Sequence, residues 1–322
     1  MDPLTDLLNG TRASGAVFNQ SFLSGAWALR FLTDAPLALA VPLHGSCWVV
    51  PEGGAPARLG AGDVAVLAGG APYVIADDPA TEPDVVIHSA DSCTTPRGEE
   101  LSHRLASDVR TWGAAARPDG TRLLSGLYTV DGGSVPRRLL AALPPLAVVE
   151  AGLMSCPLGP TAFEEITREE PGQQALLDRV LDLVLVSALR AWFTRSSAQA
   201  PAWFLAHGDP VVGRALRLLH ADPAHPWTVA ALAARNGVSR ASLARRFTAL
   251  VGRPPMAYLR EWRLALAADL LREPGMTVGA VAGRVGFASA FGLSAAFKRE
   301  RGISPSEHRA GPASGPGRGR GR

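Results

Sequence analysis

Apolar residues in the first half of the chain fall in short runs that glycine and proline separate. Runs of this length, bounded by turn residues, are typical of buried β-strands. Their spacing of roughly ten residues predicts an all-β sandwich or small barrel over residues 1–155. The more polar segment 93–120 is expected to be a loop or flap. The runs lie at 27–32, 37–43, 47–50, 63–68, 73–76, 85–90, 123–130 and 146–151.

The pattern changes to a helical period in the following connector, residues 156–206. Within it, residues 173–196 place apolar side chains at the i, i+3, i+4 spacing of an amphipathic helix. The apolar stripe is wide for an isolated helix. Two compatible roles are therefore open, packing against the β domain and forming a dimer interface. The stripe contains Leu176, Leu177, Val180, Leu181, Val184, Leu185, Ala188, Leu189 and Trp192.

The C-terminal third of the chain contains the same helical pattern twice. The two copies are WTVAALAARNGVSRASLARRFTALVGRPP and MTVGAVAGRVGFASAFGLSAAFKRERGISP. Thr228 aligns with Thr277 at an offset of 49, and Phe247 aligns with Phe297 at an offset of 50. The difference of one residue falls in the turn, where an insertion disturbs the helices least.

Each copy predicts a helix, a short turn and a second helix. Gly237 and Gly286 supply the turns. Ser239 and Ser289 suit the start of the second helices, because a serine hydroxyl there accepts an unpaired backbone N–H. This order is the pattern of a helix-turn-helix, whose second helix enters the DNA major groove. A helix over 255–272 joins the copies, so the domain is expected to be all-α with two recognition helices.

Charge divides the chain at nearly the same place as the hydrophobic pattern. Residues 207–322 hold 18 Lys and Arg against 7 Asp and Glu, whereas residues 1–206 hold 14 against 22. A cationic module joined to an anionic one favours DNA as the partner of the cationic module. The DNA-binding domain is expected to cover residues 207–310. The remaining tail, 311–322, is rich in Gly, Pro and Arg and is expected to be disordered.

The second helix of each copy has an inner apolar face and an outer face for DNA. The residues expected to point inward are Leu243, Phe247 and Leu250, and Leu293, Phe297 and Ile303. The expected DNA-contacting residues of the first copy are Ser239, Arg240, Ala241, Ser242, Ala244, Arg245 and Arg246. Those of the second copy are Ser289, Ala290, Phe291, Ser294, Ala295 and Lys298, on an outer face that includes Ala296.

The two outer faces differ in chemistry. Arginine binds guanine through two hydrogen bonds or pairs with phosphate, whereas Phe291 or an alanine can only touch a thymine methyl group. We therefore expect the first recognition helix to dominate base reading and the second mainly to position the protein. On the joining helix, Trp262 is expected in the core, and Arg260 or Arg263 is a candidate phosphate contact.

The C-terminal sequence resembles the AraC/XylS family of transcriptional regulators over roughly 100 residues, with GFAS, FKRERG and SPSEHR standing in the family's order. The resemblance implies two helix-turn-helix subdomains joined by a long helix and bound to adjacent major grooves. A polar or basic residue is common in the family where Ala295 stands, which is a departure in this chain. The family's base-contacting positions correspond to Ala241, Ala244, Arg245, Ala290, Phe291, Ser294 and Ala295.

The stretch GSCWVVPEGGAPARLGAGDVAVLAGGAPYVIADDP resembles the cupin-like sensor domain of one subgroup of that family. The resemblance implies a double-stranded β-helix that controls the DNA-binding half, and some relatives sense oxidants through cysteines. Metal-binding cupins use two closely spaced histidines, a carboxylate and a later histidine. Here His44 stands alone, and Tyr73 follows Pro72 where a histidine is common. We therefore expect no metal site and no cofactor.

Five residues of the sensor half are candidates for receiving a signal. Cys93 is the better redox candidate, since Arg97 nearby favours a thiolate, and Cys156 is intermediate. The three cysteines are far apart and form no zinc motif, which is typical of reduced thiols in the cytoplasm. The candidates are His44, Cys47, Tyr73, His88 and Cys93.

These observations predict a sequence-specific DNA-binding transcriptional regulator, an activator, controlled by a small molecule or an oxidant. Double-stranded DNA is the expected partner, and RNA polymerase and a second copy of the chain are candidates. No signal peptide or membrane span is expected, so the protein should act in the cytoplasm. The alternative function is a cupin metalloenzyme with an accessory DNA-binding domain, but we expect no enzyme.

Overall fold

The chain folds into two compact units. The β unit contains Leu8–Asp131 and Leu139–Ala200, and the helical unit contains Met1–Leu7, Gly132–Arg138 and Pro201–Arg322. The computed structural model describes residues 3–8, 19–89, 92–101, 106–108, 111–113, 120–128, 134–154, 170–195 and 200–310.

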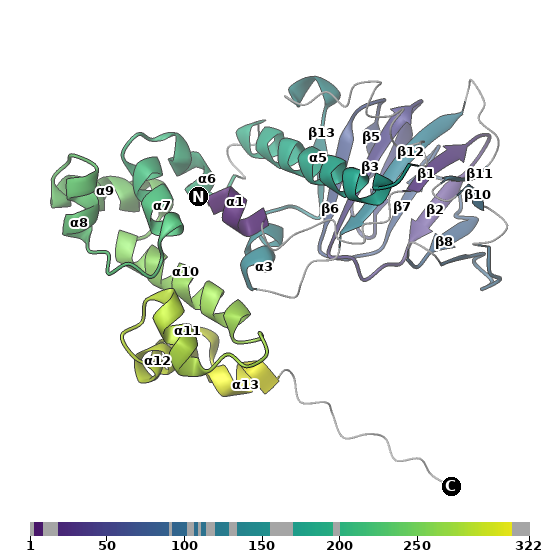
Figure 1. The fold of residues 1–322 in the computed structure, drawn as a ribbon. Helices are drawn as coiled ribbons and strands as arrows, with labels where there is room; N and C mark the ends of the chain where they lie inside the picture. The colour runs from purple at the N-terminus through teal and green to yellow at the C-terminus, as the bar shows by residue number, and fades with distance from the viewer. Residues whose placement is uncertain are drawn as a thin grey trace, which may run out of the picture. The chain divides into compact units, whose positions relative to one another are not determined.

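Two sheets build the β unit, as the alternation of short apolar runs predicts (Figure 1). One sheet has the order β10-β11-β1-β12-β3-β6-β13, and the other has the order β5-β4-β7-β2-β8-β9. The strands are β1 (Asn19–Leu23), β2 (Ala28–Phe31), β3 (Leu37–His44), β4 (Cys47–Pro51), β5 (Ala57–Leu59), β6 (Val64–Ala68), β7 (Tyr73–Ala76), β8 (Val85–Ile87), β9 (Cys93–Thr94), β10 (Ala106–Asp108), β11 (Thr111–Gly113), β12 (Thr121–Tyr128) and β13 (Leu146–Val149).

The space between the two sheets is filled with apolar side chains. Leu29, Val49 and Ile75 from one sheet meet Leu67 and Leu123 from the other in a single buried cluster. Strand pairing is antiparallel except for β1 with β11 and β2 with β8. The interior of the β unit is therefore a packed hydrophobic core, whose burial is its main source of stability.

The helix α5 (Gln173–Arg195) covers the outer face of the larger sheet (Figure 1). Leu181 lies against Gly126 of β12, and the Tyr128 hydroxyl donates to the Leu181 carbonyl over 2.9 Å. This cover explains why β3 is buried on both faces rather than on alternate residues. Packing against the β domain, the first of the two roles predicted for this helix, is confirmed, while Leu183 stays 50% exposed.

Some short elements differ from the sequence expectation. Segment 93–120, expected to be a loop, contributes β9, β10 and β11, which have only two or three residues each and too few apolar positions to show a period. The strands β1 and β5 were likewise absent from the predicted runs. The strand expected over 146–151 is shorter in the structure: β13 ends at Val149, and a 3-10 helix, η1 (Ala151–Leu153), begins at residue 151. The predicted tail, 311–322, lies outside the described residues.

The helical unit has two hydrophobic cores that share one central helix. Its elements after residue 200 are α6 (Ala202–Leu205), η2 (Ala206–Gly208), α7 (Val212–Ala221), α8 (Val229–Arg235), α9 (Arg240–Val251), α10 (Pro255–Leu270), α11 (Val278–Val285), α12 (Ala290–Arg301) and α13 (Pro305–Ala310). Tyr258 and Leu259 of α10 belong to the first core, and Leu264 and Ala268 belong to the second. The predicted joining helix is therefore part of both cores, with Trp262 buried as expected.

Two short segments from the predicted β half belong to the helical unit. The helix α1 (Pro3–Leu8) buries Leu4 and Leu7, and its Asp6 carboxylate lies 2.6 Å from Nδ1 of His220. Nε2 of His220 lies 2.8 Å from the Tyr258 hydroxyl, so a buried chain of three polar groups ties α1 to α7 and α10.

The second of these segments lies at the start of α3 (Ser134–Leu140). The backbone N–H of Val135 donates to the Asp269 carboxylate over 3.0 Å. The guanidinium of Arg138 lies 3.4 Å from the Glu261 carboxylate, so both contacts are made to α10.

Candidate nucleic-acid interface

The first helix-turn-helix consists of α8 and α9. Thr228 caps α8 by accepting from the backbone N–H of Ala231 over 3.0 Å, and Ser239 caps α9 by accepting from Ser242 over 3.2 Å. Gly237 has a φ of +66°, a left-handed conformation that glycine adopts without strain. The predicted turn and cap are both confirmed.

The second helix-turn-helix repeats this construction in α11 and α12. Thr277 accepts from Ala280 over 3.1 Å, and Ser289 accepts from Gly292 over 3.1 Å. Gly286, at the turn, has a φ of +84°. The same threonine, glycine and serine positions therefore carry out the same backbone functions in both copies, as expected of a duplication.

The inner faces of the recognition helices are anchored in the two cores. Phe247 and Phe297 are fully buried, as are Leu243 and Leu293. The expectation for Leu250 and Ile303 is wrong: they are 40% and 41% exposed, and Val251 is buried in place of Leu250. Leu250 lies on the last turn of α9 and Ile303 lies beyond the end of α12, where an extrapolated helical period no longer fixes direction.

The outer face of α9 carries two arginines without an ion-pair partner in the described part of the chain. Arg240 and Arg245 are exposed, as is Ala241, while Ser242 and Ala244 are half-buried between them. A guanidinium held on a rigid helix with its donors unused is suited to two hydrogen bonds with guanine or to a phosphate contact.

Arg246 is engaged differently from its neighbour. Its Nη2 lies 2.7 Å and its Nε 2.8 Å from Oδ2 of Asp209, whose other oxygen accepts from Val211 and Val212. Burial acts to raise the pKa of Asp209, but the backbone N–H of Val212, Arg246 and the N–H of Val211 outweigh it and hold this pKa below its usual value. Arg246 thus ties α9 to the start of α7.

The outer face of α12 is almost uncharged at its start. Phe291 is 83% exposed, Ala290 and Ala295 are also exposed, and Ser294 is half-buried. Lys298 is exposed near the C-terminal end of the helix. Ala296, expected to face outward, is instead buried at 7% exposure in the second core, so it is not part of this surface.

The sensor candidates are spread over the β unit. Nδ1 of His44, at the end of β3, lies 2.9 Å from the Gly120 carbonyl, and Nε2 of His88 lies 3.0 Å from the Thr94 hydroxyl. His44 is the last residue of β3 and His88 directly follows β8, and these two strands belong to different sheets. Among the described residues, no three His, Cys, Asp or Glu side chains are grouped as metal ligands.

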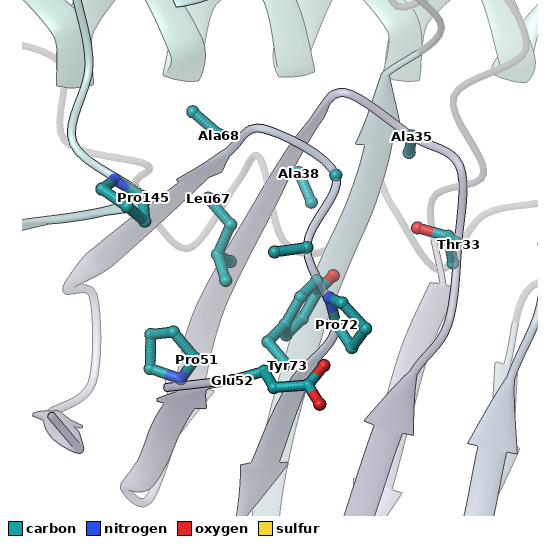
Figure 2. Close-up of a pocket in the computed structure, with 12 residues that line it drawn as sticks. Thr33, Ala35, Ala38, Pro51, Glu52, Leu67, Ala68, Pro72, Tyr73 and Pro145 are labelled. Atoms are coloured by element: carbon teal, nitrogen blue, oxygen red, sulfur yellow. The ribbon is translucent and has the colours of Figure 1, made fainter. Parts of the chain in front are cut away.

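Tyr73 lines a small cavity at one end of the sheets (Figure 2). Its ring stacks on Phe31 with 4.7 Å between centroids, and burial raises the pKa of its phenol above the usual value. Glu52, an exposed residue, also lines this cavity. The volume of about 30 Å³ holds one or two water molecules, whereas sites for organic ligands begin at roughly 300 Å³.

The two described cysteines differ in accessibility. Cys47 is 1% exposed, and burial, with a further contribution from Asp63, raises the pKa of its thiol to about 12. Cys93, on β9, is half-buried. In their sheet, the strands β7, β2 and β8 separate β4 from β9. Cys156 lies outside the described residues.

We expect Cys47 to be nearly inert toward alkylating agents at neutral pH. With a pKa of about 12, about one thiol in 10⁵ is ionised at pH 7, compared with a few per cent for an ordinary cysteine. Because the pKa is raised, labelling should increase about tenfold per pH unit up to pH 11. Mass spectrometry after timed labelling of the folded full chain measures this. Labelling of Cys47 as fast as Cys93 at pH 7, with both equally fast in denaturant, would contradict the assignment.

Some functional contacts carry no signal in the sequence pattern. The sequence did not predict that Asp209 binds Arg246. It also did not predict that Arg263 binds backbone carbonyls. Arg263, a candidate phosphate contact, donates to three carbonyls within the helical unit. Arg260 is exposed, and the described residues offer it no ion-pair partner. Only the tertiary structure shows that Arg263 binds carbonyls of the protein and that Arg260 is exposed. The sequence pattern does not distinguish them, because both lie on the same predicted helix.

No single helix of the described residues is long and apolar enough to cross a membrane. The pair α11 and α12 has sufficient length and apolar content only when taken together, and its two helices meet at 84°. This pair is the second helix-turn-helix.

Two family models match the chain. A model described as "Cupin" matches residues 2–194, and one described as "Helix-turn-helix domain" matches residues 232–311. Together with the two capped recognition helices, these matches define a DNA-binding transcription regulator with an N-terminal cupin domain. The two-domain class predicted from the sequence is confirmed.

Similar proteins specify the family. The chain is 31% identical over 317 residues to an AraC-like transcription regulator of Streptomyces lividans, covering 97% of this chain and 99% of that protein. It therefore belongs to the AraC-like transcription regulators. It is also 25% identical over 320 residues to the HTH-type transcriptional regulator AlkR of Acinetobacter baylyi, covering 96% and 99% of the two chains.

Two further similarities cover part of the chain. The RCS-specific HTH-type transcriptional activator RclR of Escherichia coli is 32% identical over 151 residues, covering 47% of this chain and 52% of that protein. The solved DNA-binding domain of AdpA, in complex with a target DNA, is 35% identical, covers 32% of this chain and 92% of that chain, and has a TM-score of 0.31.

Proposed function

We propose that this regulator is a cytoplasmic transcriptional activator that recognises two neighbouring short DNA sequence elements, here called boxes. In this proposal α9 makes most of the contacts with bases. The observation that carries the proposal is the contrast between the outer faces of α9 and α12. Arg240 and Arg245 present guanidinium donors that no described residue engages, whereas Phe291 and Ala295 present apolar contacts. In this proposal Arg246 contributes positive charge near the DNA phosphate backbone while it stays bound to Asp209.

Selection of randomised duplexes by the purified full chain tests this proposal. The expected result is a motif of two boxes about one helical turn apart, with guanine prominent in the box that α9 reads. A one-box motif, or information concentrated in the box of α12, would contradict the asymmetry. A reporter gene placed behind the selected site then distinguishes activation, with RNA polymerase as the second partner, from repression.

The cupin domain is proposed to receive either an oxidant or a small molecule. For an oxidant, Cys93 is the better candidate of the two cysteines that the structure describes, because the Cys47 thiol is buried and protonated. For a small molecule, the cavity at Tyr73 must enlarge, because about 30 Å³ admits no organic ligand. Either signal changes DNA binding only if it prefers one conformation of the protein. DNA binding measured with and without hypochlorite, on the wild type and Cys93→Ser, separates the two cases.

A homodimer through α5 is proposed from the side of that helix which the β unit leaves uncovered. Leu183 is 50% exposed, Leu176 38% and Leu153 of η1 44%. Leu153 and Leu183 line an open groove of about 540 Å³ beside Arg190 and Ala191. An apolar stripe of this kind on a helix rimmed by arginine and threonine suits a second copy of the same stripe.

Replacing Leu183 by aspartate is expected to weaken this dimer at least about tenfold, because the change buries a charge at the centre of an apolar contact. Light scattering after gel filtration at several concentrations measures the effect. Leu32→Asp is the matched control, since Leu32 is a similarly exposed leucine, at 38%, elsewhere on the β unit. A wild-type chain that stays monomeric at tens of micromolar, or equal effects of both variants, would argue against this interface.

The alternative function is a cupin metalloenzyme with an accessory DNA-binding domain. It requires a group of three or four metal ligands. Among the described residues, His44 and His88 are engaged with Gly120 and Thr94 and belong to no such group. Stoichiometric metal in the purified chain, together with turnover of a substrate, would revive the enzyme hypothesis.

A further inference from the structure

Arg263, on the central helix α10, joins the two helix-turn-helix units to each other. Its Nε donates to the Pro223 carbonyl over 2.7 Å, and its Nη2 donates to the His225 carbonyl over 2.8 Å. Its Nη1 donates to the Gly286 carbonyl over 2.9 Å. The first two carbonyls lie in the loop before α8, and the third lies in the turn between α11 and α12. All three guanidinium nitrogens are thus committed to backbone oxygens of the protein.

The loop that Arg263 holds is itself ordered. The backbone N–H of His225 donates to the Asp222 side chain over 3.0 Å, and Nε1 of Trp227 donates to the Asp222 carbonyl over 2.9 Å. The rings of His225 and Trp227 pack with 4.3 Å between centroids. Because these contacts fix the loop, its carbonyls are a rigid anchor for the guanidinium rather than a flexible one.

Gly286 brings the second turn directly onto this loop. A Cβ atom at Gly286 would lie 2.6 Å from the carbonyl oxygen of Ala224 and 2.8 Å from its Cα. Both atoms belong to backbone, so a side chain here requires the two units to move apart. With its φ of +84°, the position also has a conformation that favours glycine. The loop before α8 and the turn before the recognition helix α12 therefore meet in one close contact, which Arg263 closes.

We propose that Arg263 and Gly286 form a junction that fixes the separation and relative rotation of α9 and α12, and so sets the spacing of the two DNA boxes. Arg263 is a positioning residue in this proposal, not a phosphate contact. The inference rests on the proposed two-box function and adds a determinant of specificity to it. One base pair changes the position of a box by about 3.4 Å along the duplex and about 34° around it. A rigid junction cannot follow such a change.

Duplexes that differ only in box spacing test the junction. The probes are the duplex selected by the wild-type chain and the same duplex with one base pair inserted or deleted between the boxes. The wild type should lose about tenfold or more in affinity at either altered spacing, the cost of losing contacts in one box. Arg263→Met and Gly286→Ala should reduce this ratio to about threefold or less, because a loosened junction tolerates both spacings. Fluorescence anisotropy measures the ratio.

Gly286→Ala keeps the charge of Arg263, so the two variants together separate geometry from electrostatics. Arg260→Met is the control, because it removes an exposed arginine of the same helix and should leave the spacing ratio unchanged. It should also make the salt dependence shallower, by about one unit of slope if Arg260 contacts phosphate. Arg263→Met and Gly286→Ala should leave that slope unchanged.

Several outcomes would overturn the junction. One is an Arg263→Met protein that binds all spacings proportionally more weakly, with a shallower salt slope, since that behaviour belongs to a phosphate contact. Another is a wild-type chain with no spacing preference. Circular dichroism verifies folding, and if Arg263→Met does not fold, Gly286→Ala decides the question. Failure of the wild type to select any sequence would instead overturn the proposed function.

Discussion

Replacing Arg245 by alanine is expected to lower the affinity for the selected duplex by about 1–3 kcal/mol, a five- to 150-fold loss. The side chain is exposed on α9, and no described carboxylate occupies its guanidinium. It stands one position before Arg246, which Asp209 holds at 2.7 Å. Arg245 is therefore free to form two hydrogen bonds with a base, and its loss should relax specificity at that base. Competition binding against single-base variants of the site measures both effects.

Matched variants distinguish base reading by Arg245 from a general loss of charge. Arg97→Ala removes an exposed arginine from the β unit and should leave binding unchanged. Arg246→Ala should weaken binding evenly across sequences, without relaxing any one position. Phe291→Ala and Ser294→Ala should each cost less than Arg245→Ala. If either costs more, the dominance of α9 is wrong.

Replacing Asp6 by alanine is expected to destabilise the helical unit by about 2–4 kcal/mol. The His220 side chain is 1% exposed, and its Nδ1 would lose the carboxylate that lies 2.6 Å away. A buried nitrogen without a hydrogen-bond partner has lost its hydration and gains no compensating hydrogen bond, which destabilises the folded state. The loss should extend to α10, because the other ring nitrogen of His220 lies 2.8 Å from the Tyr258 hydroxyl.

Hydrogen exchange on the full chain locates this effect. Peptides from α7 and α10 should exchange faster in Asp6→Ala, while peptides from β3 and β6 should not change. Asp34→Ala is the control, since Asp34 is an exposed aspartate of the β unit and such changes usually stay within about 0.5 kcal/mol. Unchanged exchange in α7 would show that α1 contributes nothing to the stability of the helical unit.

The sequence predicted those elements whose local signals agree with one another. In α8, α9, α11 and α12, apolar period, glycine turn and hydroxyl cap all indicate the same boundaries, and the structure confirms them. The β-strands with long apolar runs were predicted for the same reason. The helix α1 was missed because its six residues, PLTDLL, show little period. Its burial depends on contact with His220, which is 214 positions away in the chain.

The partners of individual arginines were beyond the reach of the sequence. The helical period places Arg240, Arg245 and Arg246 on one outer face but does not show that Asp209 folds back onto Arg246. Likewise, the carbonyls that hold Arg263 belong to a loop and a turn whose paths depend on tertiary packing. Spacing predicts the direction of a side chain, whereas its partner depends on the route of the rest of the chain.

The shared central helix has a consequence for how such a duplicated domain can diverge. Because α10 contributes to both cores, a substitution that disrupts the packing of one core should also destabilise the other. The outer faces of α9 and α12 contribute nothing to those cores and are free of that constraint. Each DNA-facing surface can therefore change its preferred bases without altering the scaffold, so one ancestral repeat can come to recognise two unlike sequences at a constant interval.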